Sequence, residues 1–352
     1  AFFGMCTKYA EIALALQYRV TDEKGAHKGG PMYYIENGLG KSWKPLAVLF
    51  SILGGLASFG IGNIAQSSEI AGAMDGLFGM NSMVTGVLLA VVVGIVVIGG
   101  VKRIGQVASY LVPFMAIFYI LAGVVVIVMR IGDVPAVLAN IFTSAFSFES
   151  VGGGVFGYAI MVAMKQGFAR GVFSNEAGLG SAPIAHAAAD VNHPVKQGIY
   201  GVFEVFMDTI VVCTMTGLTI VLTGSWDVGL EGVAVTTRAF QQGLPLPGEI
   251  SSLLLMICLV FFGFTTILGW DYYSERCLEY LCNKRAWVIQ IFRWLYILAV
   301  LAGPFLTVQA VWNIADIFNG LMAFPNLIAI VALSGVIAKE TRSYFERNRL
   351  GK

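Results

Sequence analysis

The sequence predicts an all-α polytopic membrane protein in which residues 1–352 form a single transmembrane domain. Hydrophobic residues make up 57% of the chain and charged residues only 12%, whereas a typical soluble domain carries about 25% charged residues. The mean hydropathy of +0.78 agrees with this imbalance. Helices are the expected form of the membrane segments, because a helix satisfies its own backbone hydrogen bonds in lipid and no ten-residue alternating pattern indicates a β-barrel.

The apolar residues fall into about nine stretches that approach or exceed the roughly 20 residues a spanning helix requires. The stretches are roughly 1–18, 45–72, 82–100, 106–129, 142–172, 197–223, 249–274, 286–306 and 318–338. The first begins abruptly at Ala1, without a methionine, so we expect the chain to be a fragment that lacks helices upstream. Residues 304–318 are expected to lie outside the membrane or to re-enter it partly, because a tenth span would place the basic carboxyl end outside.

Basic residues gather in alternate connections, which the positive-inside rule places in the cytoplasm. These connections are flanked by Lys8, Arg19, Lys24, Lys28, Lys41 and Lys44, then by Lys102 and Arg103, by Lys165, Arg170 and Lys196, and by Arg276, Lys284 and Arg285. Residues 76–81 and 224–248 show no such excess and are expected outside. The basic carboxyl-terminal tail is therefore expected in the cytoplasm, and the protein in the cytoplasmic membrane of a prokaryote.

Several function classes are disfavoured by composition. The net charge of +1 provides no basic face for nucleic acid, so the expected partners are lipid and small solutes. The chain has only three histidines and no HExxH sequence, which argues against a catalytic zinc. Ser174 and Ser181 lack the GxSxG context of a hydrolase nucleophile. We therefore expect no catalytic residue and no enzymatic activity.

The stretch 142–172 is longer than a bilayer requires and contains Gly152, Gly153 and Gly154 near its middle. Adjacent glycines each cost roughly 1 kcal/mol in a helix relative to alanine. One interpretation is a broken helix whose free amides and carbonyls bind a ligand at the membrane midplane; the other is close helix packing through small residues. Phe156, Gly157 and Ile160 follow at helical spacing, and they would line a pocket beside such a break or simply pack in the core.

Polar residues at membrane depth supply the other candidates. Asn63 and Gln66 lie three residues apart on one helix face, where they could bind a ligand or form interhelical hydrogen bonds. Thr265 and Thr266 could each give an oxygen to a hard cation, although membrane threonines commonly bond the carbonyl four residues earlier. Trp270 is too deep for an interfacial belt and could form the wall of a cavity.

Glu204 and Asp208 lie one helical turn apart within an apolar stretch, a costly placement that suggests function. They could relay a proton, line an ion path or form a hydrogen-bonded structural pair. The sequence leaves these three possibilities open.

A series of motifs extends in order along the whole chain. They are Ala1 to Glu11, Gly29 to Ile35, Gly62 to Gln66, residues 171–189, Phe264 to Trp270 with Tyr272 and Tyr273, and Asn319 to Asn326. Together they resemble the alanine or glycine:cation symporters, which are sodium-coupled transporters of small neutral amino acids. The segment 171–189 is the most specific of these matches.

The resemblance implies a leucine-transporter-like bundle with an inverted repeat and two broken core helices. The first broken helix would precede Ala1 and is missing, and residues 142–172 would correspond to the second. The implied function is sodium-driven import of alanine, glycine or a similar amino acid, without a cofactor besides the coupling sodium ion. A proton-coupled transporter of the same fold is the main alternative, and a channel is an alternative from another class.

The resemblance also assigns the candidate residues. Thr265 and Thr266 would contribute to a sodium site. The amino-acid pocket would be formed by Asn63, Gln66, Gly153, Gly154, Phe156, Gly157, Ile160 and Trp270. The segment 171–189 would be a cytoplasmic loop with a structural or gating role, too far from the midplane to contact substrate.

Overall fold

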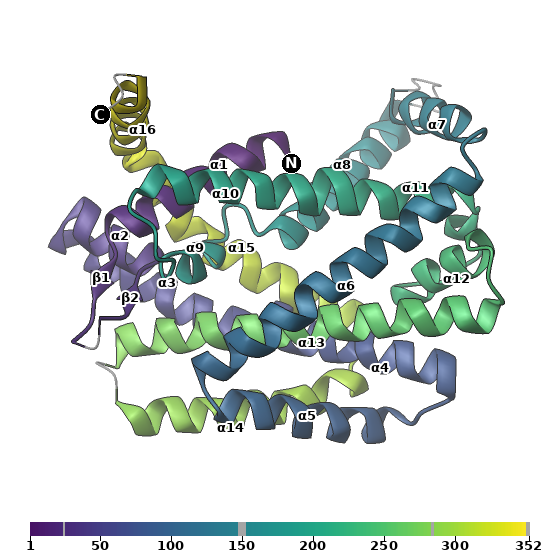
Figure 1. Cartoon of the computed structure of the whole chain (residues 1–352), viewed down its shortest axis with the longest axis horizontal. Coiled ribbons are helices and arrows are strands. Elements are labelled where there is room, and N and C mark those ends of the chain that lie inside the picture. The colour runs from purple at the N-terminus through teal and green to yellow at the C-terminus, as the bar shows by residue number, and fades with distance from the viewer. Residues whose placement is uncertain (24, 147–152, 283–284, 350–352) are drawn as a thin grey trace.

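A computed structural model describes the chain except residues 24, 147–152, 283–284 and 350–352. The described part is almost entirely helical (Figure 1), as the composition predicts. One short hairpin interrupts the helices near the amino end, where β1 (Val20–Thr21) pairs with β2 (His27–Lys28) in antiparallel register. The all-α class and the polytopic character are therefore confirmed.

The helices follow one another with short connections. In the first half they are α1 (Phe2–Gln17), α2 (Pro31–Leu39), η1 (Lys41–Trp43), α3 (Lys44–Ala57), η2 (Ser58–Ile64), α4 (Ala65–Phe78), α5 (Ser82–Ile98), α6 (Val101–Met129), α7 (Val134–Phe146) and α8 (Gly153–Asn175). In the second half they are α9 (Ala182–His186), α10 (Pro194–Val205), η3 (Phe206–Cys213), α11 (Thr214–Leu222), η4 (Ser225–Asp227), α12 (Val233–Gly243), α13 (Gly248–Leu281), α14 (Ala286–Ala302), η5 (Gly303–Phe305), α15 (Val308–Ala332) and α16 (Ser334–Arg349).

Among the described residues, six helices are long and apolar enough to cross a membrane. They are Lys41–Phe78, Lys102–Met129, Pro194–Leu222, Gly248–Leu281, Ala286–Phe305 and Gln309–Ala332. Two other expected spans are shorter helices, with 16 residues in α1 and 17 in α5. The stretch 142–172 includes parts of α7 and α8; of the three glycines at the predicted break, Gly152 lies outside the described residues, and Gly153 and Gly154 begin α8. The count of about nine spans is therefore not confirmed.

The region around residue 310 differs from the expectation. We expected 304–318 to be an external or partly re-entrant piece followed by a span over 318–338. Instead, α15 runs without interruption from Val308 to Ala332, and α16 begins at Ser334. The reason is local: Thr307 caps the helix by accepting a hydrogen bond from the Ala310 amide, so the helix starts a few residues after Pro304.

Two of the spans contain π-helical segments. The segment η2 lies between α3 and α4, and η3 lies between α10 and α11. A π-helical turn widens the helix and leaves the regular hydrogen-bond ladder locally, a feature that is frequent at functional sites. The candidate Asn63 belongs to η2, and the candidate Asp208 belongs to η3.

Helix α13 forms the centre of the bundle (Figure 1). It contributes residues to all three buried apolar clusters: Trp270 belongs to the cluster that includes residues of α2, α3 and α15, Ile267 to the one that includes residues of α5 and α14, and Leu255 to the one that includes residues of α6 and α12. In Figure 1 the hairpin, α2 and α16 lie at one end of the bundle, and α7 and α12 lie at the other. Because α13 contacts helices from both halves of the chain, it positions most of the candidate site.

Candidate functional site

The segment 171–189 comprises the end of α8, a largely buried loop at residues 176–181, and α9 with the residues after it. Within it, Glu176 has a φ of 54°, Gly178 of 92° and Gly180 of 83°. Two of these left-handed positions carry glycine, which adopts them without strain, while the third carries a glutamate. Asn175 closes the turn by accepting a hydrogen bond from the Ala177 amide at 3.0 Å. The glycine punctuation of this motif is therefore explained by a tight turn whose amides point inward.

Glu11 of α1 binds the amides of this loop. One carboxylate oxygen accepts from the Gly178 amide at 3.1 Å and the other from the Gly180 amide at 3.0 Å. The Asn326 side chain on α15 donates both to Glu11, at 2.5 Å, and to the Gly178 carbonyl, at 2.9 Å. Tyr34 of α2 donates to the Asn326 amide oxygen. Glu11, Tyr34 and Asn326 belong to three motifs that are distant in sequence. They meet at the loop of a fourth motif, the segment 171–189.

Lys8 and Glu204 connect the loop to α10. The fully buried ammonium of Lys8 donates to the Asn175 carbonyl at 2.8 Å and lies 3.4 Å from a Glu204 oxygen. The other Glu204 oxygen lies 2.9 Å from Nε2 of His186. Asp208 accepts from the Ser174 and Thr209 hydroxyls. Each of the two acidic residues therefore bonds partners of its own, and the three possibilities stay open.

Glu176 connects the loop to α13. Its carboxylate accepts from the indole N–H of Trp270 at 3.1 Å and from the Ser181 hydroxyl at 2.6 Å. Burial raises the pKa of the Glu176 carboxyl above its ordinary value, against the opposing effect of the Lys8 charge and these hydrogen bonds. We expected this segment to stay away from the pocket. It directly contacts one of the predicted pocket residues, because the turn folds into the bundle instead of extending into solvent.

Four predicted site residues lie on three elements that pack together, η2, α4 and α13. Asn63 in η2 is buried and donates to the Tyr296 carbonyl of α14 at 2.7 Å, while Gln66 in α4 donates to the Ile61 carbonyl at 3.2 Å. On α13, Thr265 donates to the Phe261 carbonyl at 2.8 Å, and Thr266 to the Phe262 carbonyl at 2.8 Å. The Asn63 bond is therefore interhelical and the two threonine bonds go to the carbonyl four residues earlier, as considered from the sequence, whereas the Gln66 bond stays within its own helix.

Glycine makes the contact between η2 and α13 possible. A Cβ atom added at Gly62 would lie 2.2 Å from the Cβ atom of Trp270. At Gly263 an added Cβ would lie 2.8 Å from the Ile70 side chain. Gly62 therefore allows the close approach of η2 to α13, and Gly263 allows that of α4 to α13.

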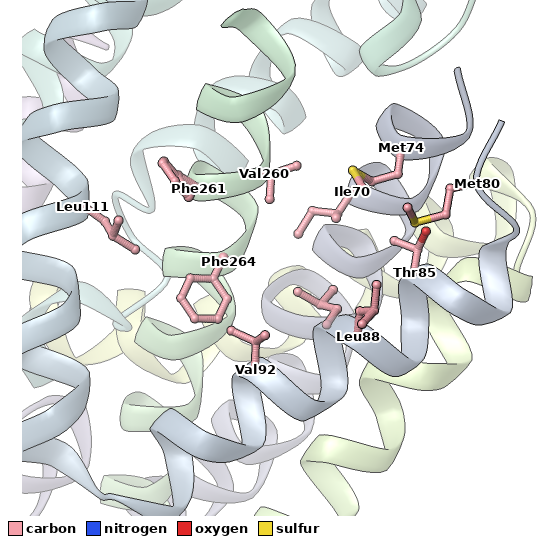
Figure 2. Close-up of a pocket in the computed structure, with 11 residues that line it drawn as sticks. Ile70, Met74, Met80, Thr85, Leu88, Val92, Leu111, Val260, Phe261 and Phe264 are labelled. Atoms are coloured by element: carbon pink, nitrogen blue, oxygen red, sulfur yellow. The ribbon is translucent and has the colours of Figure 1, made fainter. Parts of the chain in front are cut away.

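Two cavities are lined by residues of both α4 and α13. One, of about 360 Å³, is lined by Gln66, Glu69, Thr236, Phe262 and Trp312 among others, so it combines polar and aromatic walls. The other, of about 230 Å³, is shown in Figure 2. Its walls are aliphatic, aromatic and methionine side chains apart from Thr85, so it offers little to a charged amino acid. Of the two, the first is the better match to the predicted pocket.

The remaining predicted pocket residues lie on α8. Ile160 is on this helix, whose main packing partner is η3 rather than α13. Gly153 and Gly154 begin α8, and Phe156 and Gly157 lie in its first two turns. The side chains at these four positions lie outside the described part of the structure. Their role in the pocket stays a prediction.

Lys8, Glu11 and Asn326 lie within the sequence motifs, but the sequence alone assigned none of them to the site. The available signal was a lysine and a glutamate three residues apart inside the apolar stretch 1–18. Their partners are more than 160 positions away along the chain, so no local pattern could identify them.

Comparison with known proteins agrees with the motif pattern. The sodium:alanine symporter family model matches residues 1–352. The chain is 49% identical over 352 residues to an uncharacterized transporter of Haemophilus influenzae, covering 99% of this chain and 76% of that protein. It is 45% identical to the sodium/alanine symporter AgcS of Methanococcus maripaludis, covering 98% and 76%. It is 40% identical over 354 residues to the probable sodium/glutamine symporter GlnT of Bacillus subtilis, covering 100% and 72%.

These matches confirm the resemblance that the motifs indicated, and the names of these three proteins describe transporters. The chain belongs to the sodium:alanine symporter family and is a transporter rather than an enzyme.

Proposed function

We propose that this protein imports alanine, glycine or a similar small neutral amino acid together with sodium across the cytoplasmic membrane. The observation that carries the proposal is the match of the sodium:alanine symporter family model to residues 1–352. The protein named sodium/alanine symporter, at 45% identity, supports alanine as the first substrate to test. Sodium acts as the coupling ion, and no enzymatic cofactor takes part.

The proposed sodium ligands are the hydroxyl oxygens of Thr265 and Thr266. Each hydroxyl uses its hydrogen in a bond to a carbonyl of its own helix. The lone pairs of each oxygen remain available for a cation, and sodium is held by oxygen atoms of this kind. The helix bond therefore orients the hydroxyl without using up its capacity as a ligand.

The proposed amino-acid pocket lies where η2 and α4 face α13. Gln66 supports this placement, because it lines the polar cavity of about 360 Å³ beside Phe262 and Gly263. Asn63 and Trp270, together with Gly153, Gly154, Phe156, Gly157 and Ile160 of α8, would complete it. A small rigid pocket excludes large side chains, since overpacking costs roughly 1–3 kcal/mol.

The fold we propose is the leucine-transporter-like inverted repeat with about nine spans and a cytoplasmic carboxyl terminus. Its support is topological. The connections with excess basic residues, around the hairpin and α2, lie at the same end of the bundle as α16 (Figure 1). The connection bearing α12, which has no such excess, lies at the other end.

Transport in this scheme needs no chemical step. Sodium and amino acid together bind one conformation more tightly, and the population shifts toward it. The buried loop takes part as a gate, because any movement of α13 away from the loop must break the hydrogen bond between Trp270 and Glu176. Glu11, in contrast, holds the loop to α1 and α15 through several bonds.

The test is uptake by the purified protein in liposomes under an imposed sodium gradient. We expect alanine to accumulate above its external concentration, to stop accumulating when choline replaces sodium, and to be displaced by glycine but not by leucine. Accumulation driven only by a pH gradient would instead identify a proton-coupled transporter. Uptake that never exceeds the external concentration would identify a channel. Either result would overturn the proposal.

A further inference from the structure

Helix α13 carries an unpaired carboxylate directly after Trp270. Asp271 is fully buried, with no exposed surface, and neither of its oxygens has a hydrogen-bond partner among the described residues. It lies within a helix that is long and apolar enough to cross a membrane. An ionised carboxylate without a partner is very costly in such surroundings. Asp271 therefore requires a positive charge that the described side chains do not supply.

The charged residues around Asp271 also include too little positive charge. Glu275, one helical turn further along, is also buried, and it is bound by two nitrogen atoms of Arg293 on α14, one of them at 3.0 Å. Asp271 interacts electrostatically with both of these residues. Since Arg293 is already paired with Glu275, two carboxylates share a single guanidinium. One negative charge is left without compensation.

No hydroxyl donor compensates for it. Tyr296 of α14 is electrostatically close to Asp271, but its hydroxyl donates to the Ile267 carbonyl at 2.9 Å. Among the described residues, Glu275, Arg293 and Tyr296 are the titratable groups that interact with Asp271. The element η2, which packs on the same part of α13, contributes no ionisable side chain.

A second unpaired oxygen lies at the same junction. Asn63 in η2 donates to the Tyr296 carbonyl, but its own buried amide oxygen accepts from no described group. The preceding residue, Gly62, lies against Trp270, the neighbour of Asp271. Asn63 and Asp271 therefore share Tyr296 of α14 as a neighbour, since Asn63 bonds its carbonyl and Asp271 acts electrostatically on its hydroxyl. Oxygen atoms of carboxylate and amide groups are suitable ligands for a hard cation.

We propose that Asp271 binds a monovalent cation, H⁺ or Na⁺, at the junction of η2, α13 and α14, with the amide oxygen of Asn63 nearby. This site is separate from the one proposed at Thr265 and Thr266, because five residues of helix correspond to about 7.5 Å along the axis. Bound cation neutralises the cluster, and its release leaves a charge that disfavours the packed conformation. The inference rests on the proposed symport only for its transport readout.

Two substitutions in the purified protein test whether the uncompensated charge of Asp271 binds a cation. Asp271→Asn removes the uncompensated charge and keeps the shape. Glu275→Gln keeps Asp271 but frees Arg293 to pair with it, so it should remove the need for the cation by a different route. Asp316→Asn is the matched control, because it makes the same chemical change at a partly exposed residue paired with Arg170. Melting temperature is measured against sodium concentration, with choline as the replacement, at several pH values.

We expect wild type and Asp316→Asn to be stabilised by the cation, and Asp271→Asn and Glu275→Gln to lose that stabilisation. If the cation is sodium, the loss appears in the sodium titration, and the number of sodium ions moved per amino acid in liposomes falls by one. If it is a proton, the sodium titration keeps its shape and the pH dependence of stability flattens. Either arm supports the site.

The inference would be overturned if Asp271→Asn folds and its melting temperature depends on sodium and on pH as strongly as that of wild type. If Asp271→Asn does not fold, the same comparison is made with Glu275→Gln, and unchanged dependence on both sodium and pH in that variant would also overturn the inference. Failure of the proposed symport would look different. Amino-acid accumulation would be absent in wild type, while the stability titrations would still report whether Asp271 holds a cation.

Discussion

At the scale of single residues, the site depends on side chains that satisfy their own helix and still present an oxygen. Thr265 and Thr266 are the clearest cases, since both hydroxyls bond a carbonyl four residues earlier. Such a bond contributes little to stability, because the carbonyl is already engaged in the helix. A role in sodium binding can therefore be separated from a role in folding by removing the hydroxyl alone.

We predict that Thr265→Val and Thr266→Val each weaken the apparent affinity for sodium, on the order of tenfold, which corresponds to about 1.4 kcal/mol. Valine keeps the shape and loses the oxygen ligand. Thr237→Val is the control, because Thr237 makes the same type of helix bond on α12. The measurement is alanine uptake against sodium concentration. Unchanged sodium affinity in both variants would place the sodium site elsewhere.

Glu176 yields a prediction about pH. Its pKa is raised in the folded protein, chiefly by burial, so the folded state binds its proton more tightly than the unfolded state does. Stability from this group is complete below the ordinary glutamate pKa and is lost as the pH rises through the raised value. Glu176→Gln removes this titration, while its amide oxygen can still accept from Trp270.

The measurement is melting temperature against pH for wild type and Glu176→Gln. We expect the stability of wild type relative to the variant to decrease as the pH rises above the ordinary glutamate range. Parallel curves over that range would contradict the assignment of a raised pKa to Glu176.

At the scale of elements, the contact between η2 and α13 is the most specific packing feature of the candidate site. Its closeness depends on Gly62, whose Cα faces the Trp270 side chain. The same segment carries Asn63 and leads into Gln66, so displacement of η2 would move two candidate pocket residues at once. Packing at this contact therefore affects both folding and binding.

We predict that Gly62→Ala destabilises the protein by roughly 1–3 kcal/mol, the usual cost of overpacking, and weakens alanine binding. Gly55→Ala is the matched control in α3, where an added Cβ meets nothing within 4 Å. That change should be neutral or slightly stabilising, because alanine is the better helix former. Melting temperature and alanine affinity are the readouts. Equal behaviour of the two variants would show that the contact is looser than described.

The elements also show which predictions the sequence supports. Apolar length predicted the helices at α3–α4, α6, α13 and α14, because a helix in lipid is determined by residues that are neighbours in the chain. The same reasoning misplaced the start of α15, since it could not anticipate the Thr307 cap. Apolar length also gave no reason to expect the π-helical turns η2 and η3. Their register depends on tertiary contacts such as that between Gly62 and Trp270.

At the scale of the whole molecule, the motifs that identified the family come together in space. Glu11, Tyr34, Glu176, Trp270 and Asn326 come from five different motifs and form one connected set of hydrogen bonds. The motifs were therefore recognisable from sequence, but their purpose was not. Periodicity describes one helix at a time, whereas this network links α1, α2, α13 and α15 through a loop.

The two proposed sites would couple their ligands through α13. The proposed sodium ligands lie on α13, and the proposed amino-acid pocket lies where η2 and α4 pack on it, so occupation of either site would favour the same packing of these elements. Linkage requires that this preference be reciprocal. If sodium tightens the binding of alanine by some factor, alanine must tighten the binding of sodium by the same factor.

Isothermal titration of the purified protein tests this claim most directly. Alanine affinity is measured at several sodium concentrations, and sodium affinity with and without saturating alanine. The account predicts equal factors in the two directions, in the range of about 5–150-fold that is typical of coupled sites. Alanine affinity that is the same in sodium and in choline would contradict it.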